Sequence, residues 1–137
     1  MNPNIWGPAT WTFLHTITFT YPDNPTIDDK KNMYNFFMNL SNVLPCEKCK
    51  INFDDHLRDY PLTSEVLCSK SSLSRWLIDI HNEINKLNKK SVLSYQQVED
   101  YYNRMYSGKN TCMYVGFYGI IIIFVILLII AVYKLKK

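Results

Sequence analysis

The sequence has few of the features that identify nucleic-acid-binding or β-sheet proteins. No run of Lys or Arg is longer than a pair, and the formal net charge of the 137 residues is +3, so no nucleic-acid-binding surface is indicated. No segment alternates polar and apolar residues over the length of a strand, and the dipeptides that form β-hairpin turns are absent. We therefore predict one small, all-α domain.

The N-terminus also lacks a signal peptide, whereas the C-terminal part is strongly apolar. Residues 113–133 carry no charge, and a helix of this length spans roughly 30 Å of hydrocarbon. Tyrosines near its ends and lysines after it are typical of membrane-interface positions. We predict a transmembrane helix at 113–133, a juxtamembrane linker at 108–112 and a basic tail at 134–137. The simplest topology is a single-pass tail anchor that leaves the N-terminal domain, residues 1–107, on the cytosolic side.

Apolar residues in the first hundred positions recur with helical spacing, and caps or prolines bound each run. The predicted helices span about residues 7–19, 27–44, 46–58, 73–87 and 95–105, with a loop at 61–69. The boundary signals are Pro8 in a first turn, Thr26 as a cap, Pro45 as a break, Ser71 or Ser72 as a cap, and Ser94 with Gln97 as a capping box. The result is a four-helix bundle with a short fifth helix.

The sequence contains only four cysteines, and only two of them are close together. Cys46 and Cys49 form a CxxC motif directly after Pro45. At positions i and i+3 of a helix start, the two sulfurs share a face and can close a disulfide with little backbone movement. The free N–H groups of the first turn favour the thiolate form. Such a pair is suited to repeated electron exchange.

A lone CxxC motif is also compatible with other chemistry. A zinc site needs two further ligands, and recruiting His56 and Cys68 gives a spacing that matches no common zinc finger or ribbon. A thioredoxin-type motif follows a β-strand, whereas a predicted helix and Pro45 precede this one. A membrane-anchored zinc-binding protein and a cofactor-free thiol-disulfide carrier stay as the alternatives to an oxidoreductase.

A second group of polar residues lies on the predicted fourth helix. His81 and Asn85 are four residues apart, and Asn82 and Asn85 are three apart, so their side chains converge on one side. Taken alone, such a cluster is more often a solvated face or a satisfied hydrogen-bond network than a ligand site.

Three motifs in this order resemble the Erv/ALR family of sulfhydryl oxidases. They are WGPATW with FLHT and ITFTYPDNPT, then LPCEKC, then RWLIDIHNEIN with KLNKK, and together they cover about residues 6–102. The resemblance implies a four-helix bundle with a short fifth helix that holds FAD noncovalently, and usually a homodimer. Cellular members carry a disulfide that frames the HNxxN helix, and here Ile78 and about Ser94 stand at the matching positions. The missing disulfide, together with a stretch at residues 85–89 that is one residue shorter than in cellular relatives, resembles the compact oxidases of large cytoplasmic DNA viruses.

The resemblance also assigns roles to individual residues. Cys46 and Cys49 match the redox-active pair beside the flavin ring. The positions that match flavin contacts are Trp11, His15, Tyr21, His81, Asn82, Ile84, Asn85, Lys89 and Tyr102. Residues 85–89 are one residue shorter than in cellular relatives, so Lys90 is the alternative to Lys89.

The activity that the resemblance implies is that of an FAD-dependent thiol oxidase. A protein dithiol client or a thioredoxin-like shuttle would reduce the Cys46–Cys49 disulfide, and oxygen would finally accept the electrons as hydrogen peroxide. The membrane would be that of a host cell or a virion. Cys68 and Cys112 have no assigned counterpart. We expect Cys68 to be a free thiol in a loop, and Cys112 borders the predicted membrane span.

Overall fold

The computed structural model describes residues 1–108 and 122–126 of the chain. Its elements are α1 (Pro3–Phe19), α2 (Ile27–Val43), α3 (Glu47–Asp59), the short 3₁₀ helix η1 (Val66–Cys68), α4 (Lys70–Leu87) and α5 (Tyr95–Tyr106). Residues 122–126 are also helical. Within these described ranges there is no strand, so the predicted all-α class is confirmed for them. The chain divides into two compact units, Met1–Val98 and Glu99–Lys137.

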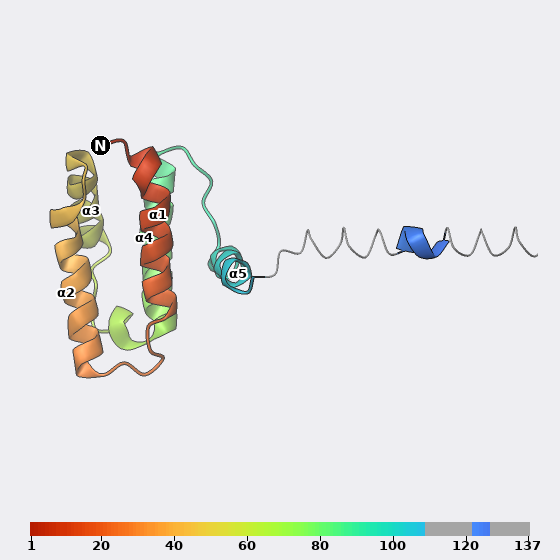
Figure 1. Ribbon diagram of the computed structural model, residues 1–137. Coiled ribbons are helices and arrows are strands. Elements are labelled where there is room, and N and C mark those ends of the chain that lie inside the picture. The colour runs from red at the N-terminus through yellow and green to blue at the C-terminus, as the bar shows by residue number, and fades with distance from the viewer. Residues whose placement is uncertain (109–121, 127–137) are drawn as a thin grey trace, which may run out of the picture. The chain divides into compact units, whose positions relative to one another are not determined.

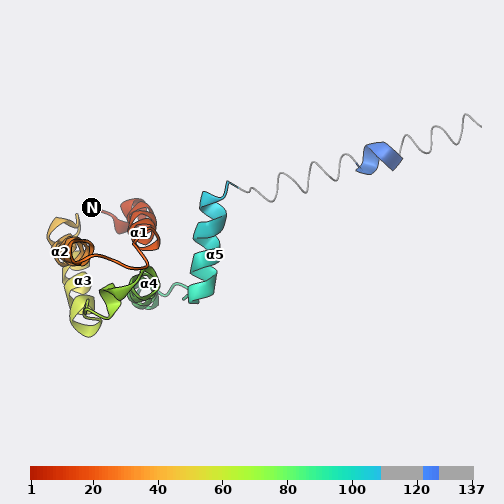
Figure 2. The same ribbon diagram turned by 90° about the horizontal axis from the view of Figure 1, so that it is seen from below.

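Four long helices of the first unit form a bundle in which α1 lies beside α4 and α2 lies beside α3 (Figures 1 and 2). The helix η1 packs on both α2 and α4. The most completely buried core side chains are Phe37, Leu73, Leu77 and Ile80. Burying each such side chain contributes about 1.5–3 kcal/mol, so this core is the main source of stability. The predicted bundle is confirmed.

The first helix begins earlier than predicted, at Pro3 and not near residue 7. Asn2 caps it, because the Asn2 side chain accepts a hydrogen bond from the Asn4 N–H at 3.0 Å. Pro3 takes the first helical position, where its missing N–H is not needed. Pro8 therefore lies inside α1, contrary to the prediction that it belongs to the first turn. The cap at Asn2 and the proline at the first helical position favour the earlier start, and Pro8 is accommodated inside the helix.

The fourth helix also begins earlier than predicted. Its N-cap is Ser69, and neither Ser71 nor Ser72 caps it. The Ser69 hydroxyl accepts from the Ser72 N–H, and the Ser72 hydroxyl accepts from the Ser69 N–H, both at 3.1 Å. Several neighbouring serines offer equivalent local signals, and the packing of η1 against α4 accompanies this choice. The cap predicted at Thr26 is confirmed, where Asp29 completes a capping box, and the capping box predicted at Ser94 with Gln97 is also confirmed.

Most of the predicted membrane span, 113–133, lies outside the described residues, and so do residues 109–112 of the predicted linker and the predicted tail, 134–137. The described part of the chain holds no helix that is both long and apolar enough to cross a membrane.

Candidate active site

The two cysteines of the CxxC motif form a disulfide at the start of α3. Cys46 is the N-cap residue of this helix, and its Cα lies 5.1 Å from the Cα of Cys49. The Cys49 N–H donates to the Cys46 sulfur at 3.3 Å. Both cysteines are half-buried, so the disulfide is partly accessible to solvent.

The position of this disulfide follows from the residues before it. Pro45 disfavours helical backbone at the preceding residue, and Leu44 accordingly has a ψ of 133°, which ends α2 at Val43. The chain re-enters a helix at Glu47, so Cys46 is left at the cap. The unpaired N–H groups of a first turn and the helix dipole favour negative charge there. A sulfur that must alternate between disulfide and thiolate is therefore well placed at residue 46.

An aromatic cluster of Trp11, His15 and His81 joins α1 to α4. The Trp11 indole stacks on the His81 imidazole, with ring centroids 3.9 Å apart and planes within 4°. His15 Nε2 and His81 Nδ1 are 2.9 Å apart, and one of these nitrogens donates to the other. Three residues predicted as cofactor contacts are thus brought together from two helices that are 66 positions apart in the chain.

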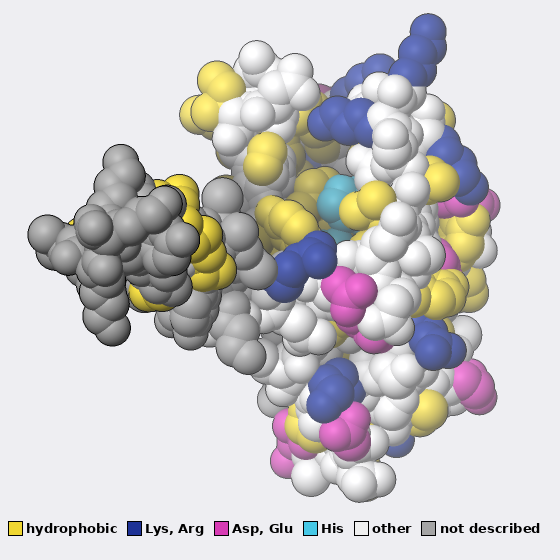
Figure 3. All heavy atoms as spheres, turned by 90° about the vertical axis from the view of Figure 1, so that its right-hand side faces the viewer, with side chains coloured by type: hydrophobic (Ala, Val, Ile, Leu, Met, Phe, Trp, Pro, Cys, Tyr) yellow, Lys and Arg dark blue, Asp and Glu magenta, His cyan; other side chains and the backbone are white. Residues whose placement is uncertain are grey.

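Both histidines of the cluster are neutral at pH 7. Burial, followed by the neighbouring His81, lowers the pKa of His15 from 6.5 to about 3. Burial, followed by the charge of Lys90, lowers the pKa of His81 to about 4. His15 is only 1% exposed, whereas His81 is half-buried. On the face drawn in Figure 3, a histidine side chain reaches the surface among apolar side chains. The cluster therefore offers an uncharged, flat aromatic surface.

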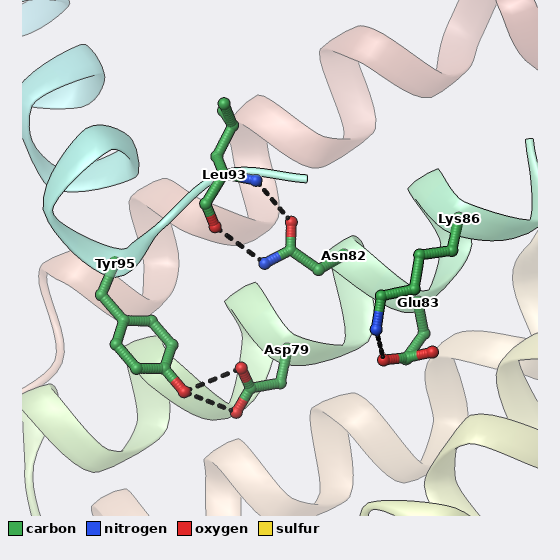
Figure 4. A network of polar contacts seen from close by, with 6 residues as sticks. All are labelled: Asp79, Asn82, Glu83, Lys86, Leu93 and Tyr95. Carbon is green, nitrogen blue, oxygen red and sulfur yellow. Dashed lines mark hydrogen bonds and ion pairs between the residues drawn. The ribbon is translucent and has the colours of Figure 1, made fainter. Parts of the chain in front are cut away.

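The other predicted contacts on α4 have different surroundings. Ile84 packs against the core. Asn85 is half-buried, and within the described residues its amide makes no hydrogen bond. Asn82 uses both polar atoms of its amide on Leu93, donating to the Leu93 carbonyl at 2.9 Å and accepting from the Leu93 N–H at 3.0 Å (Figure 4). Asn85 is thus available for a ligand, whereas the Asn82 amide is already paired.

The two lysines after α4 differ in backbone conformation. Lys89 is exposed and has a φ of 54°, in the left-handed region. Lys90 has the charge that acts on His81. The sequence analysis assigned the flavin contact to Lys89 and kept Lys90 as the alternative. No signal in the sequence indicated which of the two lysines acts on the aromatic cluster. The assignment of Lys89 to a flavin contact stays a prediction.

The two tyrosines predicted as flavin contacts, Tyr21 and Tyr102, make contacts with residues outside the aromatic cluster. Tyr21 is 4% exposed, and its hydroxyl donates to the Leu67 carbonyl of η1 at 3.2 Å. Burial raises the pKa of Tyr21, and Asp29 adds to this rise. Tyr102 belongs to the second compact unit, where its ring contacts the ring of Tyr101. Flavin contacts at Tyr21 and Tyr102 stay predictions.

The residues weighed for a zinc site are not gathered into one. In the described ranges, no group of three or more His, Cys, Asp or Glu side chains is arranged to hold a metal ion. His56 is buried in α3, whereas Cys68 is an exposed free thiol in η1. The prediction that Cys68 lies in a loop was wrong, because Cys68 is the last residue of the short helix η1. Its sulfur lies 3.6 Å from the Ser72 hydroxyl oxygen. Cys112 lies outside the described residues.

A helical bundle with a CxxC disulfide at the start of α3 and a neutral aromatic cluster between α1 and α4 defines a helical thiol-disulfide redox protein. The model of the Erv1 / Alr family matches residues 8–103. The chain belongs to this family.

Individual relatives from a virus and from a plant are also similar to this chain in sequence. The chain is 44% identical over 118 residues to a probable FAD-linked sulfhydryl oxidase of Acanthamoeba polyphaga mimivirus, covering 86% of this chain and 82% of the relative. It is 33% identical over 106 residues to an FAD-linked sulfhydryl oxidase of Arabidopsis thaliana, covering 77% of this chain and 54% of the relative. The chain thus spans most of the viral relative but about half of the plant one.

Solved structures of this family have the same fold as this chain. The crystal structure of the FAD-binding domain of Erv1 from Saccharomyces cerevisiae matches with a TM-score of 0.63 and 30% sequence identity. The match covers 69% of this chain and 87% of that domain.

Proposed function

We propose that this chain is an FAD-linked sulfhydryl oxidase, which makes disulfides in other proteins. The observation that carries the proposal is the Cys46–Cys49 disulfide at the start of α3, in a chain of this family. The names of the viral and plant relatives support both the thiol oxidase activity and FAD as the cofactor.

The residues of the aromatic cluster suit a flavin nucleotide. Trp11 and His81 already stack on each other, and an aromatic face of this kind accommodates a planar heterocycle. The half-buried Asn85 amide has donors and an acceptor that no described residue uses. The basic side chains of Lys89 and Lys90 suit a diphosphate. When bound, FAD would supply the two-electron acceptor for the reduced cysteine pair.

The thiol chemistry belongs to the chain's own cysteines. A client thiolate attacks the Cys46 sulfur, forms a mixed disulfide with it and releases Cys49 as a thiolate. A second client thiol then attacks the client sulfur of this mixed disulfide and releases Cys46. The client leaves with a disulfide, and Cys46 and Cys49 remain as a dithiol. The Cys49 N–H, which donates to the Cys46 sulfur, stabilises negative charge on the released Cys46.

The remaining parts of the proposal concern the partners. The electrons end on oxygen, so that two thiols and O₂ give one disulfide and H₂O₂. The client is a protein dithiol or a thioredoxin-like shuttle. A homodimer is supported by exposed apolar side chains on α1 and α2, which include Ile5, Phe13, Tyr34 and Met38. The apolar composition of residues 113–133 supports a membrane anchor, with the oxidase domain on the cytosolic side.

The colour of the purified protein tests the proposal most directly. A yellow protein with a flavin absorption spectrum, which consumes oxygen when given a dithiol, is the expected result. A zinc-binding protein would be colourless and would bind metal. A cofactor-free carrier would exchange disulfides without consuming oxygen. A colourless protein would therefore refute the proposed function.

Two variants test whether the aromatic cluster and Asn85 hold the cofactor. A buried cofactor group that loses its hydrogen-bond partner costs roughly 1–3 kcal/mol of binding. We therefore expect His81→Ala and Asn85→Ala to purify with less FAD, and to melt at a lower temperature that added FAD partly restores. Flavin content and melting temperature, measured with and without added FAD, are the readouts. Unchanged values in both variants would exclude these residues from the FAD site.

A further inference from the structure

The segment after α4 folds back along the helix that precedes it. α4 ends at Leu87, and Leu93 returns to Asn82, more than one helical turn before that end. The Asn82 amide donates to the Leu93 carbonyl and accepts from the Leu93 N–H, at 2.9 and 3.0 Å (Figure 4). A side chain that pairs with both backbone groups of one residue fixes that residue's position and orientation.

A second set of contacts holds the same segment two residues further on. The Tyr95 hydroxyl donates to the two carboxylate oxygens of Asp79, at 2.8 and 3.0 Å (Figure 4). The guanidinium of Arg75 lies over the Tyr95 ring, 5.3 Å from its centroid. Arg75, Asp79 and Asn82 are spaced by four and three residues, so they share one face of α4. We call these contacts of Asp79 and Asn82 with Leu93 and Tyr95 the latch.

The other end of the returning segment is fixed by backbone hydrogen bonds. The Lys90 N–H donates to the Asn85 carbonyl at 2.8 Å, and the Lys89 N–H donates to the Lys86 carbonyl at 3.0 Å. These two bonds, with Lys89 in the left-handed conformation, form a Schellman motif. The residues between this motif and Leu93 are therefore held at both ends as a loop. Lys90, whose charge acts on His81, is part of it.

We propose that Asp79, Asn82 and Tyr95 are positioning residues, which latch the fold-back loop 88–94 against α4 and thereby hold the loop's lysines at the nucleotide site. This inference rests on the proposed function, because it takes the aromatic cluster as the FAD site. It also changes the role of Asn82, which acts through Leu93 and does not contact the cofactor.

The alternative role for Asn82 gives a different pattern of effects. If the amide bonded FAD directly, only substitutions of Asn82 itself would weaken cofactor binding. The latch connects Asn82 to Tyr95 through the same loop, so substitutions at either residue release it. Tyr95→Phe is the sharper variant, since it removes the hydroxyl that contacts Asp79 and keeps the ring beneath Arg75.

The experiment uses the FAD-loaded, full-length protein and its Asn82→Ala and Tyr95→Phe variants. Glu83→Gln is the matched control, because it lies next to Asn82 on α4 and removes the ion pair with Lys86 without touching the latch. Two rates are measured: the release of FAD, followed by flavin fluorescence, and cleavage by trypsin after Lys89 and Lys90. The rate of cleavage measures how readily the loop opens, and it does not depend on the enzymatic activity of the protein.

We expect both latch variants to release FAD about three- to tenfold faster than the wild type and to be cleaved faster in the loop, while Glu83→Gln stays within twofold in both rates. Faster cleavage with an unchanged rate of FAD release would overturn the positioning role. Faster FAD release in Asn82→Ala alone, with Tyr95→Phe like the wild type, would show that Asn82 contacts the cofactor directly. A colourless wild-type protein would refute the proposed function, and the trypsin rates would still test whether the latch holds the loop.

Discussion

At the scale of single residues, the two cysteines of the disulfide have different surroundings. Cys46 caps α3 and accepts the Cys49 N–H, whereas Cys49 lies inside the first turn. A released Cys46 thiolate thus has a hydrogen bond and the positive end of the helix dipole beside it. This asymmetry suits Cys46 to exchange with clients and leaves Cys49 as its internal partner.

Single substitutions test the separate roles of the cysteines. Cys46→Ala and Cys49→Ala should each abolish oxygen uptake with a reduced protein substrate, because one sulfur alone cannot form the intramolecular disulfide. Cys68→Ala should keep normal turnover with a small dithiol, since Cys68 is an exposed free thiol outside the pair. Oxygen consumption by the purified variants is the measurement. Normal turnover by Cys49→Ala would remove the CxxC motif from the mechanism.

The two histidines of the aromatic cluster make stability depend on pH. Burial lowers the pKa of His15 to about 3 and that of His81 to about 4, whereas both have a pKa near 6.5 in the unfolded chain. Between pH 6.5 and pH 4 only the unfolded chain binds these protons, so stability is full above pH 6.5 and is lost as the pH falls. We expect the free energy of unfolding to drop by about 1.6 kcal/mol per histidine between pH 6.5 and 5.

The contribution of His81 is found by comparing how steeply the free energy of unfolding changes with pH in the wild type and in a variant without this histidine. His81→Gln cannot take up a proton, so the free energy of unfolding of this variant should change about half as much over the same pH range. Urea unfolding at several pH values measures both slopes. Equal slopes in wild type and variant would show that His81 is not held in its neutral form by the fold.

At the scale of helices and loops, the ends of α3 and α4 place the chemistry. Pro45 sets the start of α3 and so puts the disulfide at a helix cap. The Schellman motif after α4 turns the chain back along that helix. Ile78, where the resemblance places a cysteine in cellular relatives, is 1% exposed, and the Asp79–Tyr95 hydrogen bonds lie beside it. Noncovalent contacts therefore hold the start of α5 to α4 in this chain.

The left-handed conformation of Lys89 gives a test of the α4 end. A residue with a Cβ pays roughly 1 kcal/mol in this region, and glycine does not. Lys89→Gly should therefore raise the free energy of unfolding by about 0.5–1 kcal/mol, whereas Lys86→Gly, inside α4, should lower it by a similar amount. Chemical denaturation of the two variants measures this. A destabilised Lys89→Gly variant would mean that the Lys89 side chain has a stabilising contact that outweighs the backbone strain.

At the scale of the whole molecule, the chain combines a catalytic bundle with an apolar C-terminal segment. The aromatic cluster, the disulfide and the latch all lie within Met1–Val98. Their contacts are made between α1, α3, α4 and the start of α5. The chemistry that we propose thus belongs to the first unit, and we propose that the apolar residues 113–133 serve only as its membrane anchor.

A truncated protein tests this division. Removal of residues 108–137 should give a soluble, folded protein that retains FAD, because the apolar segment has no polar face to contribute to a bundle. Gel filtration, circular dichroism and the flavin absorption spectrum are the measurements. A truncated protein that is folded but does not retain FAD would mean that the removed residues contribute to the cofactor site.

The sequence predicted the elements well where the signals are local. Thr26 and Ser94 begin helices as their capping patterns indicate, and Pro45 ends one. The errors fell where several residues offer equal signals, as with the serines before α4, or where a stronger cap lies upstream, as with Asn2 before α1. These choices depend on small differences in local free energy that a sequence pattern does not resolve.

The sequence by itself determined the helical class and the position of the CxxC motif at a helix start, because spacing and boundary signals are local properties of the chain. The cofactor contacts that the family resemblance implies stay predictions. Only the tertiary structure decided that Trp11, His15 and His81 form one cluster, since these residues come from helices that meet only in the folded bundle. The latch has the same origin. Asn82 and Asp79 find Leu93 and Tyr95 across 11 and 16 positions of chain, through side-chain hydrogen bonds that no local pattern specifies.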